Sequence, residues 1–156
     1  MSGRVDKRLA ELGITLPQPA AAVANYVPFV TTGNLLFVSG QLPLEGGKLV
    51  VCGRLGDGLG IEEGTRAARL CGLNLLAQAR AAADGDLDRV RLVRLTAFVA
   101  SAPDFTDQPK VINGASDLMA EVLGEAGRHA RVAVGAAALP LNAAVEIEAV
   151  FELRTP

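Results

Sequence analysis

The sequence predicts an α+β fold in which one mixed β-sheet carries two long helices on a single face, with a short helix before them. Two segments, 62–83 and 110–123, repeat apolar residues at helical spacing. The C-terminal segment, 130–153, alternates its side chains with a period of two, which predicts an antiparallel hairpin. The expected order is helix, three strands, helix, strand, helix and two strands, which is typical of a layered α+β domain.

The N-terminal half supplies the remaining elements. Residues 3–13 predict an amphipathic helix that ends at Gly13, and residues 14–25 an extended, proline-containing connector. The turn signal Thr32-Gly33-Asn34 joins two β-rich runs into a hairpin. Residues 48–54 predict a further short strand. The glycine-rich loop after it lacks the residues of a phosphate-binding loop.

Size and composition limit the classes of function. The 156 residues suit one domain, 1–156, with residues 1–20 as an N-terminal helix and connector extension. A net charge of -2, one Tyr, five Phe and no Trp argue against a nucleic-acid partner. We expect a cytoplasmic protein without a membrane partner, because no secretory leader or membrane-spanning stretch is visible. Two distant cysteines and one histidine predict no metal site.

In the C-terminal segment 130–153, Arg131 is the side chain that best suggests a binding function. A guanidinium holds a carboxylate in bidentate geometry and stays charged, and the small Ala133 and Gly135 leave room beside it. The alternation predicts that Arg131 points away from the face that packs on the helices. Glu146, on the returning strand, is close enough in this hairpin to orient a water or exchange a proton. A plain Arg–Glu pair on the sheet surface is the alternative interpretation.

Other catalytic arrangements fit the sequence poorly. Ser39 does not lie in a nucleophile elbow. Cys71 falls on the apolar face of a predicted helix, where an inert thiol is expected. Glu146 and Glu148 are two residues apart on one strand, which a solvated strand face explains.

The sheet face opposite the helices is predicted to be too apolar for a free surface. It would carry Ala133, Gly135, Val150 and one of the two alternating sets of residues 93–99. An apolar face without helices over it predicts that a second copy of the chain covers it.

The segments that carry these features resemble the RidA/YjgF family, also called the L-PSP endoribonuclease family. They are GNLLFVSGQLP at 33–43, RLVRLTAFVASAPDF at 91–105 and HARVAVGAAALPLNAAVEIEAV at 129–150. With the helices between them, the resemblance covers about residues 20–153. It implies a chorismate-mutase-like α+β fold, a homotrimer, and sites in the clefts between subunits.

The resemblance also implies an activity and its residues. The family hydrolyses reactive enamines and imines, such as 2-aminoacrylate, to 2-keto acids and ammonia, without a metal or organic cofactor. The implied partner is therefore a small carboxylate-bearing metabolite. Arg131 matches the carboxylate-binding arginine, Glu146 the water-positioning glutamate, and the carbonyl of Ala133 a second group that positions the water. Further substrate-binding positions are matched by Tyr26, Ser39 and Asn113.

Two departures from the family pattern lie beside Arg131. Ala133 stands where active members usually carry a cysteine, and His129-Ala130 stands where Pro-Ala is usual. His129 and the neighbouring Arg128 would alter the part of the cleft that receives the substrate side chain. A non-catalytic or regulatory trimer that binds a small carboxylate, and a ribonuclease-type activity, therefore remain as alternatives.

Overall fold

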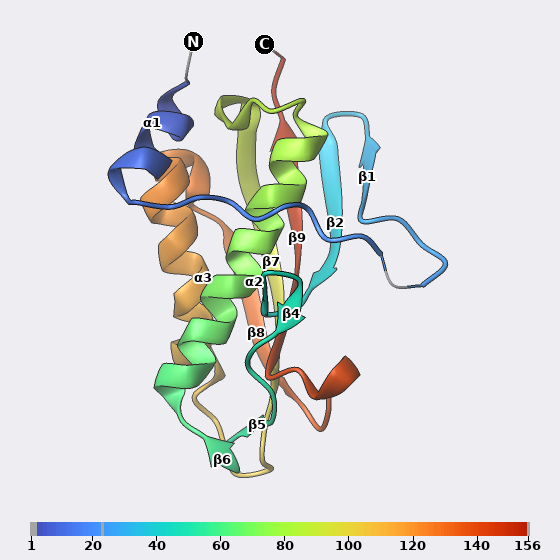
Figure 1. Cartoon of the computed structure of the whole chain (residues 1–156), viewed down its shortest axis with the longest axis vertical. Helices are drawn as coiled ribbons and strands as arrows, with labels where there is room; N and C mark the ends of the chain where they lie inside the picture. Colours follow the sequence, from blue (N-terminus) through green and yellow to red (C-terminus); the bar gives the residue numbers. More distant parts are fainter. Residues whose placement is uncertain (1–2, 23, 156) are drawn as a thin grey trace.

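The computed structural model describes residues 3–22 and 24–155, and it confirms the mixed sheet with helices on one side (Figure 1). The ends of the predicted N-terminal extension at residues 1 and 2, residue 23 of the connector, and residue 156 lie outside the described residues. Within the described part, the main sheet has five strands in the order β1-β2-β9-β7-β8. They are β1 (Phe29–Thr32), β2 (Leu35–Gln41), β7 (Val90–Ala100), β8 (Ala130–Ala136) and β9 (Val145–Leu153).

The strand pairing explains why the sheet is mixed. The β1–β2 hairpin, β2–β9 and β9–β7 are antiparallel, whereas β7 and β8 run parallel because the helix α3 (Gln108–Leu123) connects them. β8 therefore lies at one end of the strand order. As an edge strand it presents backbone N–H and C=O groups outward at alternate residues.

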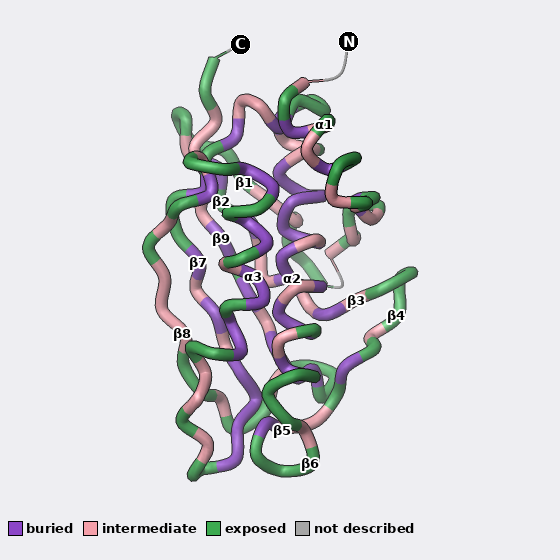
Figure 2. The backbone as a smooth tube through the Cα atoms, turned by 90° about the vertical axis from the view of Figure 1, so that its left-hand side faces the viewer, coloured by how far each residue is buried: buried purple, intermediate pink, exposed green. Residues whose placement is uncertain are grey.

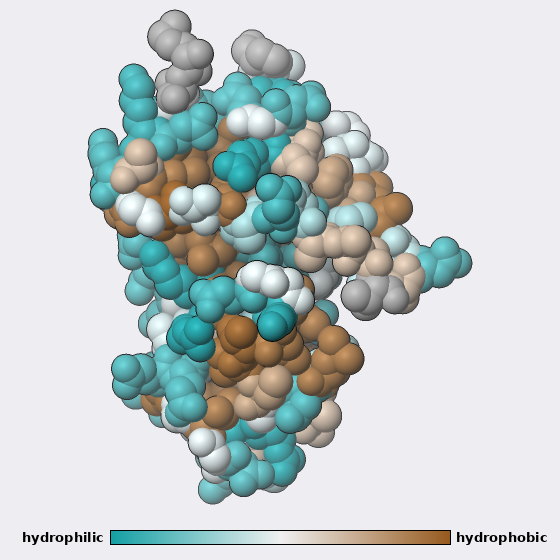
Figure 3. All heavy atoms as spheres, viewed as in Figure 1, coloured by the Kyte–Doolittle hydropathy of each residue, from teal (hydrophilic) through white to brown (hydrophobic). Residues whose placement is uncertain are grey.

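Helices α2 (Ile61–Ala82) and α3 form the second layer (Figure 2). Seen edge-on, the buried stretches lie between the sheet and these helices. The core residues of the sheet point to this side, with Leu95, Ala97 and Phe151 fully buried. The outer surface of the helix layer mixes hydrophilic and hydrophobic residues (Figure 3). Among the described residues, no helix is both long enough and apolar enough to cross a membrane.

The two long helices approach each other most closely at Gly114 of α3. A Cβ atom at this position would collide with the backbone carbonyl oxygen of Thr65 on α2. The absence of a side chain is thus what lets α3 lie directly against the α2 backbone. This contact fixes the distance of α3 from the sheet and from β8.

The short helix α1 (Arg4–Glu11) is anchored to the rest of the domain. Its apolar residues Val5 and Leu9 are buried, and the carboxylate of Asp88 accepts hydrogen bonds from the backbone N–H groups of Arg4 and Val5, both at 2.8 Å. This distant carboxylate satisfies the first turn of the helix, where Gly3 at the N-cap has no side chain to do so.

The strand predicted over residues 48–54 is wrong as a single element. The structure divides it between β4 (Lys48–Leu49), which pairs with β3 (Leu44–Glu45), and β5 (Arg54–Leu55), which pairs with β6 (Gly58–Leu59). Gly53, with φ of +112°, lies between the two pieces. An extended strand cannot pass through that backbone conformation.

The sheet face opposite the helices carries one alternating set of residues 93–99, namely Arg94, Thr96 and Phe98. Arg94 and Glu148 make this face less apolar than predicted. The register places Phe98 between Glu146 and Val134, and Phe37 beside Val150, all on this face. Phe37 is 44% exposed and Val134 is 40% exposed. The prediction that Ala133 and Gly135 lie on this open face is wrong, because Ala133 packs against the core and Gly135 faces α3.

We predict that Gly114→Ala destabilises the protein by roughly 1–3 kcal/mol, because the added methyl group meets a backbone oxygen that cannot rotate away. The free energy of unfolding in urea measures this loss. Gly72→Ala in α2 is the matched control, since its Cβ would meet the mobile end of the Leu118 side chain, at 2.9 Å. Equal stability of the two variants would contradict the proposed backbone contact.

Candidate functional site

The side chain of Arg131 lies between β8 and α3. Its Nη1 donates a hydrogen bond to Ser116 Oγ at 3.0 Å, and its Nη2 donates to the carbonyl oxygen of Pro109 at 3.2 Å. Both acceptors belong to α3, so the prediction that Arg131 points away from the helices is wrong. Alternation misled because the other set in β8, which includes Val132 and Val134, is more apolar yet faces the open side of the sheet.

This arrangement holds a cation in a fixed place. Two guanidinium N–H groups are used to anchor the side chain, and the remaining ones have no acceptor among the described residues. The guanidinium is therefore preorganised to accept an anionic group with planar geometry, such as a carboxylate.

The other predicted site residues around Arg131 lie on the same two elements and the turn before β8. Asn113 is exposed on α3, four residues after Pro109 and three before Ser116, so it belongs to the same stripe of the helix. Ala133 follows on the same face of β8. Both ring nitrogens of His129 are hydrogen-bonded, Nδ1 to the Gly127 carbonyl oxygen at 2.7 Å and Nε2 to Ser116 Oγ at 2.8 Å.

Ser116 was not predicted from the sequence. A serine in the middle of an amphipathic helix does not by itself indicate a function. Its role depends on its partners outside the helix, which are Arg131 and His129. The spacing of three residues from Asn113 was the one available indication that both lie on one side of α3.

A cavity of about 300 Å³ lies near the N-terminus of α3, where Gln108 lines it and the neighbouring Pro109 accepts from Arg131. Gly135, four residues after Arg131 on the same face of β8, forms part of its wall. The cavity is lined by Arg54, Ser101, Ala102, Pro103, Phe105, Gln108, Gly135, Ala136 and Ala137. Most of the lining residues are apolar. The Gln108 side chain adds little free polarity, because its Nε2 already donates to Ser101 Oγ and to the Phe105 carbonyl oxygen.

Glu146 belongs to a second group of residues. Its carboxylate lies against Gly40, at a bulge where the register of β2 with β9 shifts between Val38 and Gln41. Tyr26, Ser39 and Gly40 line a hollow of about 60 Å³ beside it. The Ser39 hydroxyl donates to the carbonyl oxygen of Val27 at 2.8 Å, which closes the loop before β1 over this hollow.

The environment of Glu146 favours its protonated form. Partial burial, and then the charge of Glu148 on the same face of β9, raise the pKa of the Glu146 carboxyl above its ordinary value. A carboxyl with a raised pKa is better suited to exchange protons near neutral pH than an exposed one.

The two groups are not brought together within one chain. Arg131 aligns with Leu95, and Leu95 with Ala149, so Glu146 lies two strands away and three residues further along β9. Strand geometry makes the Cα separation about 14 Å. The side chains also point to opposite faces of the sheet. Because β7 lies between β8 and β9, the predicted antiparallel hairpin over residues 130–153 is wrong. The prediction that the returning strand brings the carboxylate near Arg131 is therefore also wrong for a single protomer.

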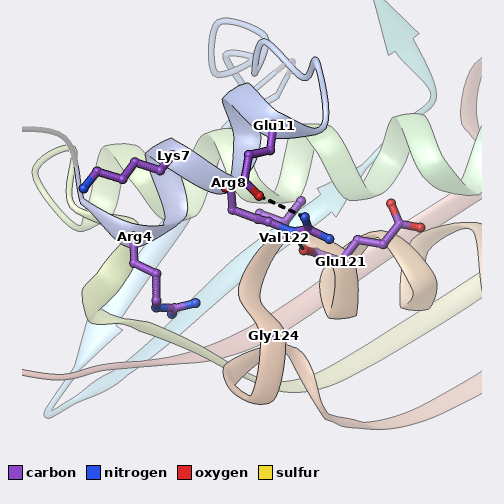
Figure 4. A pocket seen from close by; sticks show the side chains of 7 residues that line it. All are labelled: Arg4, Lys7, Arg8, Glu11, Glu121, Val122 and Gly124. Atoms are coloured by element: carbon purple, nitrogen blue, oxygen red, sulfur yellow. Dashed lines mark hydrogen bonds and ion pairs between the residues drawn. The ribbon is translucent and has the colours of Figure 1, made fainter.

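A further cavity, of about 460 Å³, coincides with neither group (Figure 4). It lies between α1 and the C-terminal end of α3, and is lined by Arg4, Lys7, Arg8, Glu11, Glu121, Val122 and Gly124. Arg8 is already bonded to the Glu11 carboxylate at 3.1 Å and to the Glu121 carbonyl oxygen at 2.9 Å. We interpret this hollow as the exposed seam where α1 is anchored, because its charges are of both signs and partly paired.

Two further observations concern other chemistries. Burial strongly raises the pKa of the Cys71 thiol, which agrees with the inert thiol expected at this position. Within the described residues, no three His, Cys, Asp or Glu side chains are grouped closely enough to hold a metal ion.

We predict a pH dependence of stability that belongs to Glu146. Because its pKa is raised in the folded state, its stabilising contribution is complete below the pKa of the unfolded chain. That contribution is lost as the pH rises through the folded pKa. Glu146→Gln should remove this decline in the free energy of unfolding, and Glu148→Gln should reduce it, since burial remains. Urea titrations between pH 4 and 8, together with ¹³C NMR titration of the carboxyl, check both; an unchanged decline in Glu146→Gln would contradict the assignment.

Comparison with known proteins agrees with this fold. A sequence model of the family described as "YjgF/chorismate_mutase-like, putative endoribonuclease" matches residues 6–153. Protein TCP17 of Trypanosoma cruzi is 53% identical over 97% of this chain and 96% of its own length. The crystal structure of the protein Atu1372 from Agrobacterium tumefaciens, a protein of unknown function, shares 55% identity and a TM-score of 0.89, over 96% of this chain and 92% of that one.

A third relative is more distant in sequence and close in structure. It is a "putative endoribonuclease" from Shewanella oneidensis, which shares 38% identity and a TM-score of 0.93, over 97% of this chain and 100% of its own. The family match spans nearly the whole chain, and the residues of both groups described above lie inside it. The chain therefore belongs to the RidA/YjgF family.

Proposed function

We propose that this protein hydrolyses reactive imines and enamines of 2-oxo acids, of the 2-aminoacrylate type, to 2-keto acids and ammonia. The observation that carries the proposal is the guanidinium of Arg131, which is held by two α3 acceptors while its further N–H groups have no acceptor among the described residues. A fixed, permanently charged fork of this kind suits a substrate that bears a carboxylate next to its reacting carbon.

The 300 Å³ cavity lies on the same side of β8 as Arg131. Its wall includes Gly135 and Gln108, the residue before the Pro109 whose carbonyl anchors the guanidinium. In our proposal the substrate extends from the Arg131 guanidinium towards this cavity. That volume is at the lower end of small-molecule sites and its wall is mainly apolar. The expected substrates are thus small 2-imino acids rather than oligonucleotides.

Water addition requires a group that takes and returns protons. In our proposal the Glu146 carboxylate accepts a proton from water as the water oxygen bonds to the imine carbon, and the C=N electron pair moves to nitrogen. Nitrogen takes this proton back from Glu146, which completes the carbinolamine. Glu146 then transfers the hydroxyl proton to nitrogen: the C–N bond breaks, the O–H electron pair forms the keto C=O bond, and ammonia leaves. An enamine first gains a proton on its terminal carbon and loses one from nitrogen, which converts it to the imine. No redox step or cofactor is needed for this balance.

Because one protomer separates Arg131 from Glu146, the proposed site is shared between copies of the chain in a homotrimer. The open sheet face exposes Phe37, Val30 and Val134, which favours a partner over solvent. The edge strand β8 places Arg131 at the boundary of the protomer, where a neighbour can supply the Glu146 group with Tyr26 and Ser39. The carbonyl of Ala133, on the same edge strand, is the second group proposed to position the water.

We predict that Arg131→Ala lowers imine hydrolysis about 100-fold, because two charge-assisted hydrogen bonds to the substrate are lost. An amino-acid oxidase generates imines from a panel of amino acids, and semicarbazide traps whatever has not been hydrolysed. Arg66→Ala is the matched control, because Arg66 is an exposed arginine of α2 whose ion pair is with Glu45. It should remain close to wild type.

The same assay separates catalysis from binding. Glu146→Gln should lose turnover and still bind pyruvate, a small 2-oxo acid. If the wild-type protein binds pyruvate but hydrolyses no imine in the panel, a carboxylate-binding protein without turnover replaces this proposal. RNA cleavage by the wild type that Arg131→Ala leaves intact would instead favour the ribonuclease-type activity.

We further predict that two inactive variants complement each other. Arg131→Ala and Glu146→Gln, unfolded together at equal concentrations and refolded, should regain about one quarter of the wild-type activity, because random assortment pairs an intact Arg131 with an intact neighbouring Glu146 at that frequency. The variants refolded separately and then mixed provide the baseline. A site built within one chain would show no recovery after joint refolding.

A further inference from the structure

A continuous series of hydrogen bonds ends at the guanidinium of Arg131. It runs from the Gly127 carbonyl to His129 Nδ1 at 2.7 Å, from His129 Nε2 to Ser116 Oγ at 2.8 Å, and from Ser116 Oγ to Arg131 Nη1 at 3.0 Å. The three side chains come from the turn before β8, from α3 and from β8. All of them are partly buried.

The direction of each proton in this series follows from its first member. A carbonyl oxygen only accepts, so Nδ1 of His129 carries a hydrogen and donates it to Gly127. In the neutral ring Nε2 is then an acceptor, and the Ser116 hydroxyl donates to it. The lone pairs of Ser116 Oγ are consequently available to the Arg131 N–H group. The dipole of the Ser116 hydroxyl then has its negative end towards the positive guanidinium, which is the favourable orientation.

We infer that Ser116 and His129 are positioning residues that fix the guanidinium of Arg131 for the substrate carboxylate, an inference that rests on the proposed function. Ser116 supplies the anchor, and His129 fixes the direction of that anchor by taking its proton. Together with the Pro109 carbonyl, they hold the fork at two nitrogens and leave its other N–H groups for the ligand.

This role differs from direct substrate binding by His129. Both ring nitrogens are occupied by protein groups, so the ring has no polar atom to offer a ligand while the series is intact. The gain comes from preorganisation: a long, flexible arginine side chain that is already held loses less freedom when the carboxylate binds.

The test compares the wild type with two variants of similar side-chain volume. Ser116→Ala removes the hydroxyl that anchors the guanidinium, and His129→Phe removes the ring nitrogen that orients this hydroxyl. We expect both to raise the Kd for pyruvate and the KM for imines roughly tenfold, the loss of one hydrogen bond to a charged group. The kcat should change less than about twofold, because neither residue takes part in proton transfer. Ser116→Thr, which keeps the hydroxyl, should restore wild-type binding, and Asp117→Ala, an exposed neighbour on α3, should have no effect.

Coupling to Arg131 distinguishes positioning from general stabilisation. In an Arg131→Lys background, Ser116→Ala should have little further effect on Kd, because the fork it orients is gone. A full additional loss would overturn the inference.

A second measurement does not depend on substrate. His129 is the only histidine in the sequence, so ¹⁵N NMR of the labelled ring reports its tautomer without overlap. We expect the Nδ1–H tautomer, with an Nε2 resonance that shifts in Ser116→Ala. An Nε2–H tautomer in the wild-type protein would overturn the assigned proton direction, and it does so even if the serine variants fail to fold.

The outcomes separate this inference from the proposed function. If the wild-type protein binds pyruvate and hydrolyses imines, while Ser116→Ala and His129→Phe bind as tightly as wild type, the positioning role is rejected and the proposed function stands. If the wild-type protein neither binds 2-oxo acids nor hydrolyses any imine, the proposed function is rejected, and the positioning role with it.

Discussion

The backbone contact between α2 and α3 is the constraint on which the position of the Arg131 guanidinium depends. Gly114 allows α3 to lie against the carbonyl of Thr65, and every α3 group that touches Arg131 is placed by that packing. Pro109 lies before Gly114 and Ser116 just after it. A shift of α3 away from α2 would therefore move both anchors of the guanidinium at once. Packing in the core therefore also determines where the Arg131 guanidinium lies, since close-packed interiors transmit displacement.

The direction in which each β8 side chain points determines how the chemistry is divided. Arg131, Ala133 and Gly135 face α3, so the open side of the strand is left with Val132 and Val134. On the same open face, β9 carries Glu146 and Glu148. The sheet thus separates a fixed cation from a carboxyl with raised pKa, and both are close to surfaces that a monomer would leave exposed.

The sequence predicts the layers of this fold well because the signals involved are local and periodic. Helical spacing identified α2 and α3, and turn chemistry at Gly33 identified the β1–β2 hairpin. The side to which Arg131 points could not be predicted, because the more apolar set of β8, which includes Val132 and Val134, faces the open side of the sheet. The contact of Ser116 with Arg131 and the separation of Glu146 from Arg131 could not be predicted either. Both depend on which elements are neighbours in the fold, and no single segment of the sequence contains that information.

The orientation of Arg131 and the pKa of Glu146 are nevertheless both set by contacts within one chain. The orientation of Arg131 comes from α3 and from the turn before β8, and the raised pKa of Glu146 comes from burial beside the β2 bulge and from Glu148. Assembly of the oligomer would then only have to bring Arg131 of one copy next to Glu146 of another, without changing the surroundings of either residue. The Arg131 guanidinium, a hydrogen-bond donor, and the Glu146 carboxyl lie on opposite faces of one sheet, so in our proposal they act together only across a boundary between copies. In our proposal, the oligomer is therefore a condition of the chemistry and not merely of stability.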